Sequence, residues 1–194
     1  MQLNIAYGTE KRLWLEWALE EHRKTDAGRR VDIRLLGRGS VEGAHEVLGG
    51  PVAMPIHVWS PASSAYRGVF ESEWRLRHGG GSPILRAEDL ALTPMVFVMW
   101  KQRFEALRDK HDTLSFTTVA SAMAEPGGWG TLANQSDWGL FKFGHTHPNK
   151  SNSGLNTLVL MACDFHQKQR GLSVADVTGA PFQRWLAAFQ RLAP

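Results

Sequence analysis

The N-terminal part of the chain alternates three times between an apolar segment of strand length and a segment with helical periodicity. The apolar segments are QLNIAYG (2–8), VDIRLLG (31–37) and PIHVW (55–59), and each runs through a polar turn into a helical pattern. Alternation of this kind predicts a parallel sheet with helices on both of its faces. The predicted fold class is therefore α/β.

The remainder of the chain follows the pattern less regularly. MVFVMW (95–100) and DWGLFKFGH (137–145) are typical of further strands, the first of them buried on both faces or crossing between two lobes. Helical spacing is found in KQRFEALRDK (101–110), in the segment before Pro126, in LNTLVLMACDFHQKQRG (155–171) and in PFQRWLAAFQRL (181–192). We expect a first α/β lobe over residues 1–93, and a crossing strand with a second, incomplete α/β lobe over 94–194.

Composition argues against several classes of protein. The 22 Lys and Arg residues outnumber the 19 Asp and Glu residues by only three, and they are scattered along the chain. Because nucleic-acid binding normally needs a basic stripe, we expect no nucleic-acid partner. Cys163 is the only cysteine, so neither an intramolecular disulfide nor a cysteine metal cluster is expected. No run approaches the roughly 20 apolar residues of a membrane span.

Small polar residues gather where the predicted strands meet the predicted helices. Ligands of open α/β sheets bind outside the carboxyl ends of the strands, where helix N-termini present unpaired N–H groups. Serine adds a hydroxyl donor, and glycine lets a ligand approach the backbone. The candidate ligand-binding residues are Gly8, Thr9, Ser40, Ser60, Ser63, Ser64, Ser151, Asn152, Ser153 and Gly154.

Helix capping is the simpler explanation for any one of these turns. Serine is a favoured N-cap residue and proline is favoured at the first helical position, so Ser60 and Pro61 fit the start of a helix. Ser40, before VEGAHEVL, is an equally plain N-cap. A helix needs only one N-cap residue, so capping does not account for Ser63 and Ser64 as well as Ser60. The same holds for the run of three polar residues at 151–153. Four polar turns at strand ends favour a ligand cleft over capping alone.

Five stretches in order resemble bacterial extracellular solute-binding proteins of the type II periplasmic-binding fold. They are NIAYGTEKRLWLEWALEEH, GRGSVEGAHEVLGG, HVWSPASSAY, PMVFVMW and WGLFKFGHTHPNKSNSGL. The resemblance is to the branch often fused to von Willebrand factor A domains, and distantly to molybdate-type binding proteins. It implies two α/β lobes, each a sheet flanked by helices, that close on a ligand like a hinged clamp.

The resemblance also implies what the chain does and where. It implies capture of a small polar or oxyanion solute for an ABC-type transporter permease, with no catalysis, cofactor or metal. The location would be periplasmic or extracellular, and membrane-associated in the full-length protein. Members of the family carry a secretion signal or anchor and continue beyond a helix like PFQRWLAAFQRL, so we expect the chain to be a fragment of a longer protein.

Three other functions stay open at this point. A binding or sensory module attached to a von Willebrand factor A domain would have the same sequence features without a transported solute. A metal-dependent hydrolase could use His145 and His147, which a strand would place on one face. A serine hydrolase is disfavoured, because WSPASS lacks the G-x-S-x-G pattern.

Overall fold

A computed structural model of the protein describes residues 1–49, 55–149 and 151–193. The chain divides into two compact units. Unit 1 comprises Met1–Thr93 with Lys150–Asn152, and unit 2 comprises Pro94–Asn149 with Ser153–Pro194. Among the described residues, no helix is both long enough and apolar enough to cross a membrane.

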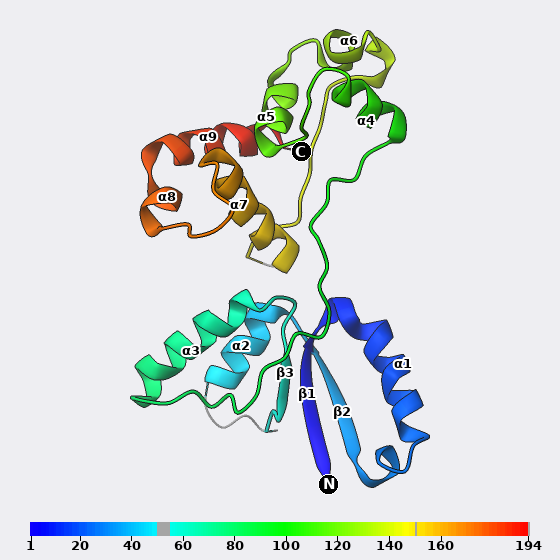
Figure 1. The fold of residues 1–194 in the computed structure, drawn as a ribbon, viewed down its shortest axis with the longest axis vertical. Coiled ribbons are helices and arrows are strands. Elements are labelled where there is room, and N and C mark those ends of the chain that lie inside the picture. The colour runs from blue at the N-terminus through cyan, green and yellow to red at the C-terminus, as the bar shows by residue number, and fades with distance from the viewer. Residues whose placement is uncertain (50–54, 150, 194) are drawn as a thin grey trace. The chain divides into compact units, whose positions relative to one another are not determined.

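Unit 1 contains a three-stranded parallel sheet, as the strand–helix alternation predicted. Its strands are β1 (Gln2–Gly8), β2 (Asp32–Arg38) and β3 (Val58–Ser60), in the order β2-β1-β3 (Figure 1). β1 lies in the middle, where Ala6 pairs with Leu36 on one side and with Trp59 on the other. Burial of the central strand between two neighbours is what its apolar sequence favours.

The helices of unit 1 lie on both sides of the sheet. Figure 1 shows α1 (Arg12–Arg23) on one side and α2 (Ser40–Leu48) with α3 (Ala65–His78) on the other. Short 3-10 turns precede α1 at Thr9–Lys11 and β2 at Gly28–Arg30. The buried apolar side chains of this unit come from β1, α2 and α3: Ala6, Tyr7, Ala44, Leu48, Tyr66 and Phe70.

One buried polar side chain ties the middle strand to the segment that leads into β3. Asn4 is only 1% exposed, and its side-chain amide donates to the carbonyl oxygen of Pro55 at 2.7 Å. Its backbone N–H donates to Nδ1 of His57 at 3.0 Å, and His57 donates its own N–H back to the Asn4 carbonyl. Since buried polar groups are costly unless bonded, these contacts fix how β3 enters the sheet.

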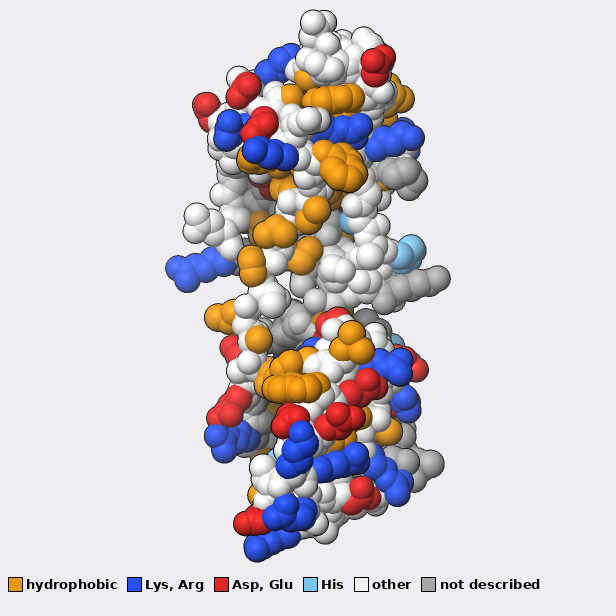
Figure 2. All heavy atoms as spheres, turned by 90° about the vertical axis from the view of Figure 1, so that its right-hand side faces the viewer, with side chains coloured by type: hydrophobic (Ala, Val, Ile, Leu, Met, Phe, Trp, Pro, Cys, Tyr) orange, Lys and Arg blue, Asp and Glu red, His pale blue; other side chains and the backbone are white. Residues whose placement is uncertain are grey.

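The apolar residues of α1 remain largely in contact with solvent. Leu13 is 82% exposed and Trp17 is 58% exposed, and no residue of α1 is buried. Figure 2 shows hydrophobic side chains gathered over the surface of this helix between charged ones. The amphipathic pattern therefore predicted the helix, although its apolar residues do not enter the core of unit 1.

Unit 2 is built from helices around an aromatic core. The helices are α4 (Lys101–Arg108), α5 (Phe116–Ala124), α6 (Gly128–Ala133), α7 (Asn152–Phe165), α8 (Val174–Thr178) and α9 (Ala180–Leu192), with a 3-10 turn at Ser136–Trp138. The rings of Phe97, Phe116, Phe143 and Phe189 contact one another edge to face, with centroids 4.9–6.5 Å apart. Trp129, Met161 and Leu107 complete this core, so hydrophobic burial holds α4, α5, α6, α7 and α9 together.

The strands predicted at 95–100 and 137–145 are wrong, because the described residues of unit 2 contain no strand. Residues 95–100 and 139–145 are irregular backbone, yet their side chains still enter the core: Phe97 and Phe143 lie 5.8 Å apart between ring centroids. Val96 and Val98 point to solvent instead, with 69% and 89% exposure. The alternation of buried and exposed residues is that of a strand, but no ladder of backbone hydrogen bonds joins these segments among the described residues.

Candidate functional site

The order of the strands points to one edge of the sheet in unit 1 as a candidate binding site. From β1 the chain crosses to β2 on one side, and then returns past β1 to β3 on the other. The order therefore reverses between β1 and β3, and ligands of open α/β sheets bind outside the carboxyl ends of the strands at such a switch point. Gly8 ends β1 and Thr9 follows it, whereas Ser60 ends β3 and the turn after it contains Ser63 and Ser64.

Hydrogen bonds join the polar turns at this edge to one another. The Lys11 ammonium, just after Thr9, donates to the Pro61 carbonyl oxygen at 3.0 Å and so links the turns after β1 and β3. The hydroxyl oxygen of Ser40, at the start of α2, accepts from the Ala62 backbone N–H at 3.1 Å. The six candidate residues of this unit named from the sequence, Gly8, Thr9, Ser40, Ser60, Ser63 and Ser64, are thus brought to one connected edge.

The expected capping roles of these serines need correction. Ser60 ends β3 and α3 begins only at Ala65, so Ser60 and Pro61 do not start that helix. Its N-cap is Ser64, whose side chain makes no capping hydrogen bond. The intervening residues form a turn, in which the Ser63 hydroxyl oxygen accepts from the Ala65 N–H at 3.2 Å.

Ser40 is the first residue of α2 and not its N-cap, which is Gly39. Gly39 has no side chain with which to cap the helix. Its own backbone N–H instead donates to Oε2 of Glu42, in the first turn of α2, at 3.2 Å. Ser40 and Ser63 therefore use their oxygens to accept backbone hydrogen bonds. A hydroxyl that accepts one bond can still donate its own hydrogen, so both remain donors toward a ligand.

Two residues that sequence reasoning missed lie at the same edge. The carboxylate of Glu10 folds over Gly8, where a Cβ atom would lie 2.4 Å from Oε1, and it pairs with the Lys11 ammonium at 2.7 Å. Tyr66, in the first turn of α3, is buried. Burial chiefly, and the negative charge of Glu10 in addition, raise the pKa of the Tyr66 phenol. Glu10 follows Gly8 and Thr9 in the sequence, and Tyr66 follows Ser63 and Ser64, so their positions next to candidate turns were a usable signal. The search for small polar residues passed over a glutamate and a tyrosine.

The fourth polar turn lies at the N-terminus of α7. Asn152 begins this helix, and its side-chain oxygen is buried without a hydrogen-bond donor among the described residues. The Ser153 hydroxyl lies 3.1 Å from that of Thr146, and the Ser153 carbonyl accepts from the Thr157 hydroxyl. Gly154 is buried, and a Cβ atom there would lie 2.2 Å from the Thr146 carbonyl oxygen. Close packing of the backbone therefore requires glycine at position 154, independently of any role in ligand binding.

The boundary between the two units passes through this turn. Ser151 and Asn152 are grouped with unit 1, whereas Ser153 and Gly154 belong to unit 2. Both serines make polar interactions. The fourth turn is therefore a junction as well as a candidate site.

The two histidines considered as metal ligands are held by hydrogen bonds. Nδ1 of His145 lies 2.9 Å from the Thr146 carbonyl oxygen, and its Nε2 lies 3.0 Å from the Gln190 amide. Nδ1 of His147 accepts from the Asn149 backbone N–H at 3.2 Å. Within the described part of the chain, no three His, Cys, Asp or Glu side chains lie close enough together to hold a metal ion.

No family model, curated protein or solved structure matches the chain in the three comparisons made with known proteins. The membership in a solute-binding family that the sequence suggested therefore stays a prediction.

Proposed function

We propose that the chain is a solute-binding protein of the type II periplasmic-binding kind, which captures a small polar solute for an ABC-type transporter. Unit 1 would be its first α/β lobe, and the fourth polar turn would supply further hydrogen-bonding groups. The observation that carries the proposal is the joining of polar turns at the switch point, above all the Lys11–Pro61 hydrogen bond between the turns after β1 and β3.

The groups at this edge favour a ligand that both accepts and donates hydrogen bonds. Hydroxyls of Ser40 and Ser63 supply donors, and Thr9 and Ser64 are exposed hydroxyl residues nearby. Glu10 supplies a carboxylate, an acceptor whose charge is offset by Lys11. A carboxylate repels an oxyanion but accepts bonds from hydroxyl or amino groups, so a neutral polar or zwitterionic solute fits better than a bare oxyanion.

The two-lobed architecture is part of the proposal, and two irregular segments of unit 2 could serve it. A type II fold requires segments that cross between lobes, and 94–100 together with 139–149 are irregular, with Phe97 and Phe143 anchoring them in the core of unit 2. A sheet in the second lobe is part of the proposal, although the described residues of unit 2 contain no strand.

A thermal-shift screen against sugars, amino acids and oxyanions tests the proposal. A ligand that binds only the folded protein raises its apparent stability by about 2.7 kcal/mol at a hundredfold excess over Kd, which shifts Tm by several degrees. We expect a stabilising sugar or amino acid. If no compound shifts Tm in this chain or in a longer one, the proposal is wrong.

The variant Glu10→Gln decides the class of solute. For a neutral or zwitterionic solute, loss of the carboxylate weakens binding about tenfold, because an acceptor of charge-assisted hydrogen bonds is lost. For an oxyanion the same change strengthens binding, since a repelling charge is removed. Gln2→Glu, which alters charge at the opposite end of β1, serves as the control and should leave affinity unchanged.

A further inference from the structure

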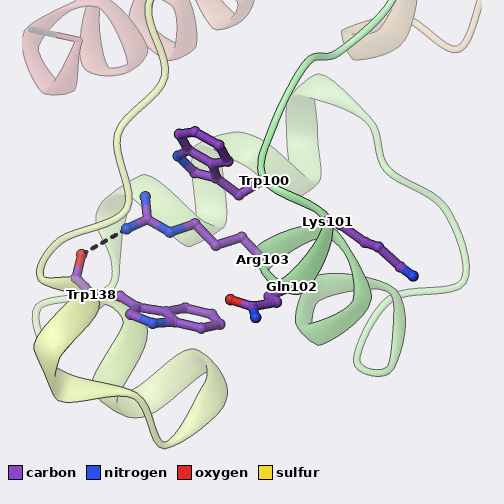
Figure 3. Close-up of a pocket in the computed structure, with 5 residues that line it drawn as sticks. All are labelled: Trp100, Lys101, Gln102, Arg103 and Trp138. Carbon is purple, nitrogen blue, oxygen red and sulfur yellow. Dashed lines mark hydrogen bonds between the residues drawn. The ribbon is translucent and has the colours of Figure 1, made fainter.

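Unit 2 contains a cavity that none of the sequence motifs indicated. Its volume is about 420 Å³, and it is lined by Trp100, Lys101, Gln102, Arg103 and Trp138 (Figure 3). Cavities of roughly 300–1,000 Å³ are the size that small-molecule ligands use. The lining residues come from the start of α4 and from the 3-10 turn before Gly139.

The Arg103 guanidinium is held in place by aromatic rings and has hydrogen-bonding capacity to spare. Its Cζ atom lies 5.4 Å from the ring centroid of Trp129 and 5.5 Å from that of Trp138. One nitrogen donates to the Trp138 carbonyl oxygen at 3.5 Å. None of the ion pairs among the described residues involves Arg103. A guanidinium carries five N–H donors, so most of them are left for an anion.

The other side of the cavity presents an open aromatic face. Trp100 is 76% exposed, and Figure 3 shows its ring and that of Trp138 on opposite sides of the Arg103 guanidinium. The Lys101 side chain runs away from the cavity, toward Glu105, whose carboxylate lies 3.8 Å from the ammonium. The Gln102 amide is directed toward Trp138. The cavity thus combines one positioned cation with a large ring available for stacking.

We propose that this cavity binds a small planar aromatic carboxylate. The carboxylate would accept two N–H bonds from Arg103, the geometry in which a guanidinium recognises such a group. The aromatic body would stack on the exposed face of Trp100. A cationic ligand would be repelled by Arg103, and a neutral aromatic one would leave the guanidinium without its partner. This site is separate from the polar edge of unit 1 and does not depend on the function proposed there.

Fluorine NMR titration of the whole chain with para-(trifluoromethyl)benzoate tests the proposal. Binding broadens and shifts the ligand resonance in proportion to the bound fraction, so weak affinity is measurable. Two matched ligands separate the contribution of the carboxylate from that of the aromatic ring. The compound para-(trifluoromethyl)benzyl alcohol lacks the charge, and 4-(trifluoromethyl)cyclohexanecarboxylate lacks the planar ring. We expect each of these to bind at least tenfold more weakly than the benzoate. Equal binding of all three ligands, or no binding of the benzoate, overturns the proposal.

Variants assign the binding to this cavity. Trp100→Ala removes an exposed side chain and is expected to weaken benzoate binding about fivefold, and Arg103→Gln about tenfold or more. Arg184→Gln makes the same charge change on an exposed side chain of α9 that does not line the cavity, and Trp17→Ala removes an exposed tryptophan of α1. Both controls should bind as the wild type does. Should Arg103→Gln fail to fold, Trp100→Ala decides alone: unchanged affinity means that the cavity is not the site.

Discussion

The Ser40 hydroxyl oxygen lies 3.1 Å from the backbone nitrogen of Ala62, across 22 residues of sequence, and accepts its hydrogen. This contact joins the start of α2 to the turn after β3. Together with the bond from Lys11 to Pro61, it makes a single edge out of turns that are separate in the sequence. The serine that sequence reasoning assigned to a helix cap is therefore a connection between two turns.

Ser40→Ala is expected to destabilise the protein by about 1 kcal/mol, because the Ala62 N–H loses its acceptor. Hydrogen exchange at the Ala62 amide should accelerate, and chemical denaturation should report the loss of stability. Ser64→Ala is the matched control, because the Ser64 side chain makes no capping bond and its loss should cost much less. Equal effects of the two substitutions would contradict the connecting role of Ser40.

Ser63→Ala and Ser153→Ala are each expected to weaken binding of the solute found in the screen by about 1–3 kcal/mol, since each leaves a ligand group without its partner. Calorimetric titration measures the affinity, and denaturation of the same variants measures stability. Stability should fall less than affinity does. The opposite result, lost stability with unchanged affinity, would mean that these serines only shape their turns.

Glu10→Gln is expected to lower the pKa of Tyr66 without returning it to the ordinary value for tyrosine. Burial is the larger cause of the raised pKa and remains, whereas the charge of Glu10 is removed. Tyr7 and Tyr66 are the two tyrosines of the chain, so ultraviolet titration of phenolate in a Tyr7→Phe background reports Tyr66 alone. An unchanged titration curve would mean that Glu10 lies too far from the Tyr66 hydroxyl to affect its pKa.

Asp176→Asn should lower stability in a pH-dependent way. The Asp176 carboxylate accepts from the Lys168 ammonium and from the backbone N–H and hydroxyl of Ser173, and these bonds hold its pKa well below the usual range. A lowered pKa in the folded state stabilises fully above the unfolded pKa, about 4, and the benefit disappears as pH falls toward the folded value.

The free energies of unfolding of wild type and Asp176→Asn should therefore differ most near neutral pH and converge in acid. Denaturation curves at a series of pH values measure this difference. Lys168→Gln should show part of the same pH dependence, because the Lys168 bond is the largest cause of the shift. A difference that stays constant with pH would contradict this account.

Two glycine substitutions should change stability in opposite directions. Gly154→Ala places a Cβ atom 2.2 Å from the Thr146 carbonyl oxygen, so backbone must shift at a cost of about 1–3 kcal/mol. Gly68→Ala, in α3, meets nothing within 4 Å and should stabilise by about 0.5–1 kcal/mol through helix propensity. Thermal denaturation measures both. If Gly154→Ala raised the stability, this would contradict the close approach of residue 154 to the Thr146 carbonyl oxygen.

The sequence predicted the sheet of unit 1 because its signals are local. The apolar segments 2–8 and 31–37, which correspond to β1 and β2 (Asp32–Arg38), both end at glycine. The segment between them has the hydrophobic spacing of a helix. The two strands, the helix and the parallel pairing of the strands could therefore be inferred. Placing polar turns at the strand ends required only the rule that parallel strands end at the same edge. The helices α4, α5, α7 and α9 of unit 2 were predicted for the same reason, whereas the short helices α6 and α8 were missed.

Only the tertiary structure decided what depends on a partner distant in sequence. The segment at 95–100 has the alternation of a strand, but a strand also needs a neighbour for its backbone hydrogen bonds, and among the described residues none provides a ladder. The connection of Ser40 to Ala62, the position of Glu10 over Gly8 and the stacking of Arg103 on Trp129 and Trp138 are likewise contacts between separate turns or elements. Periodicity fixes which way each side chain points along its own helix or strand, whereas the meeting of two elements is fixed by how their surfaces pack.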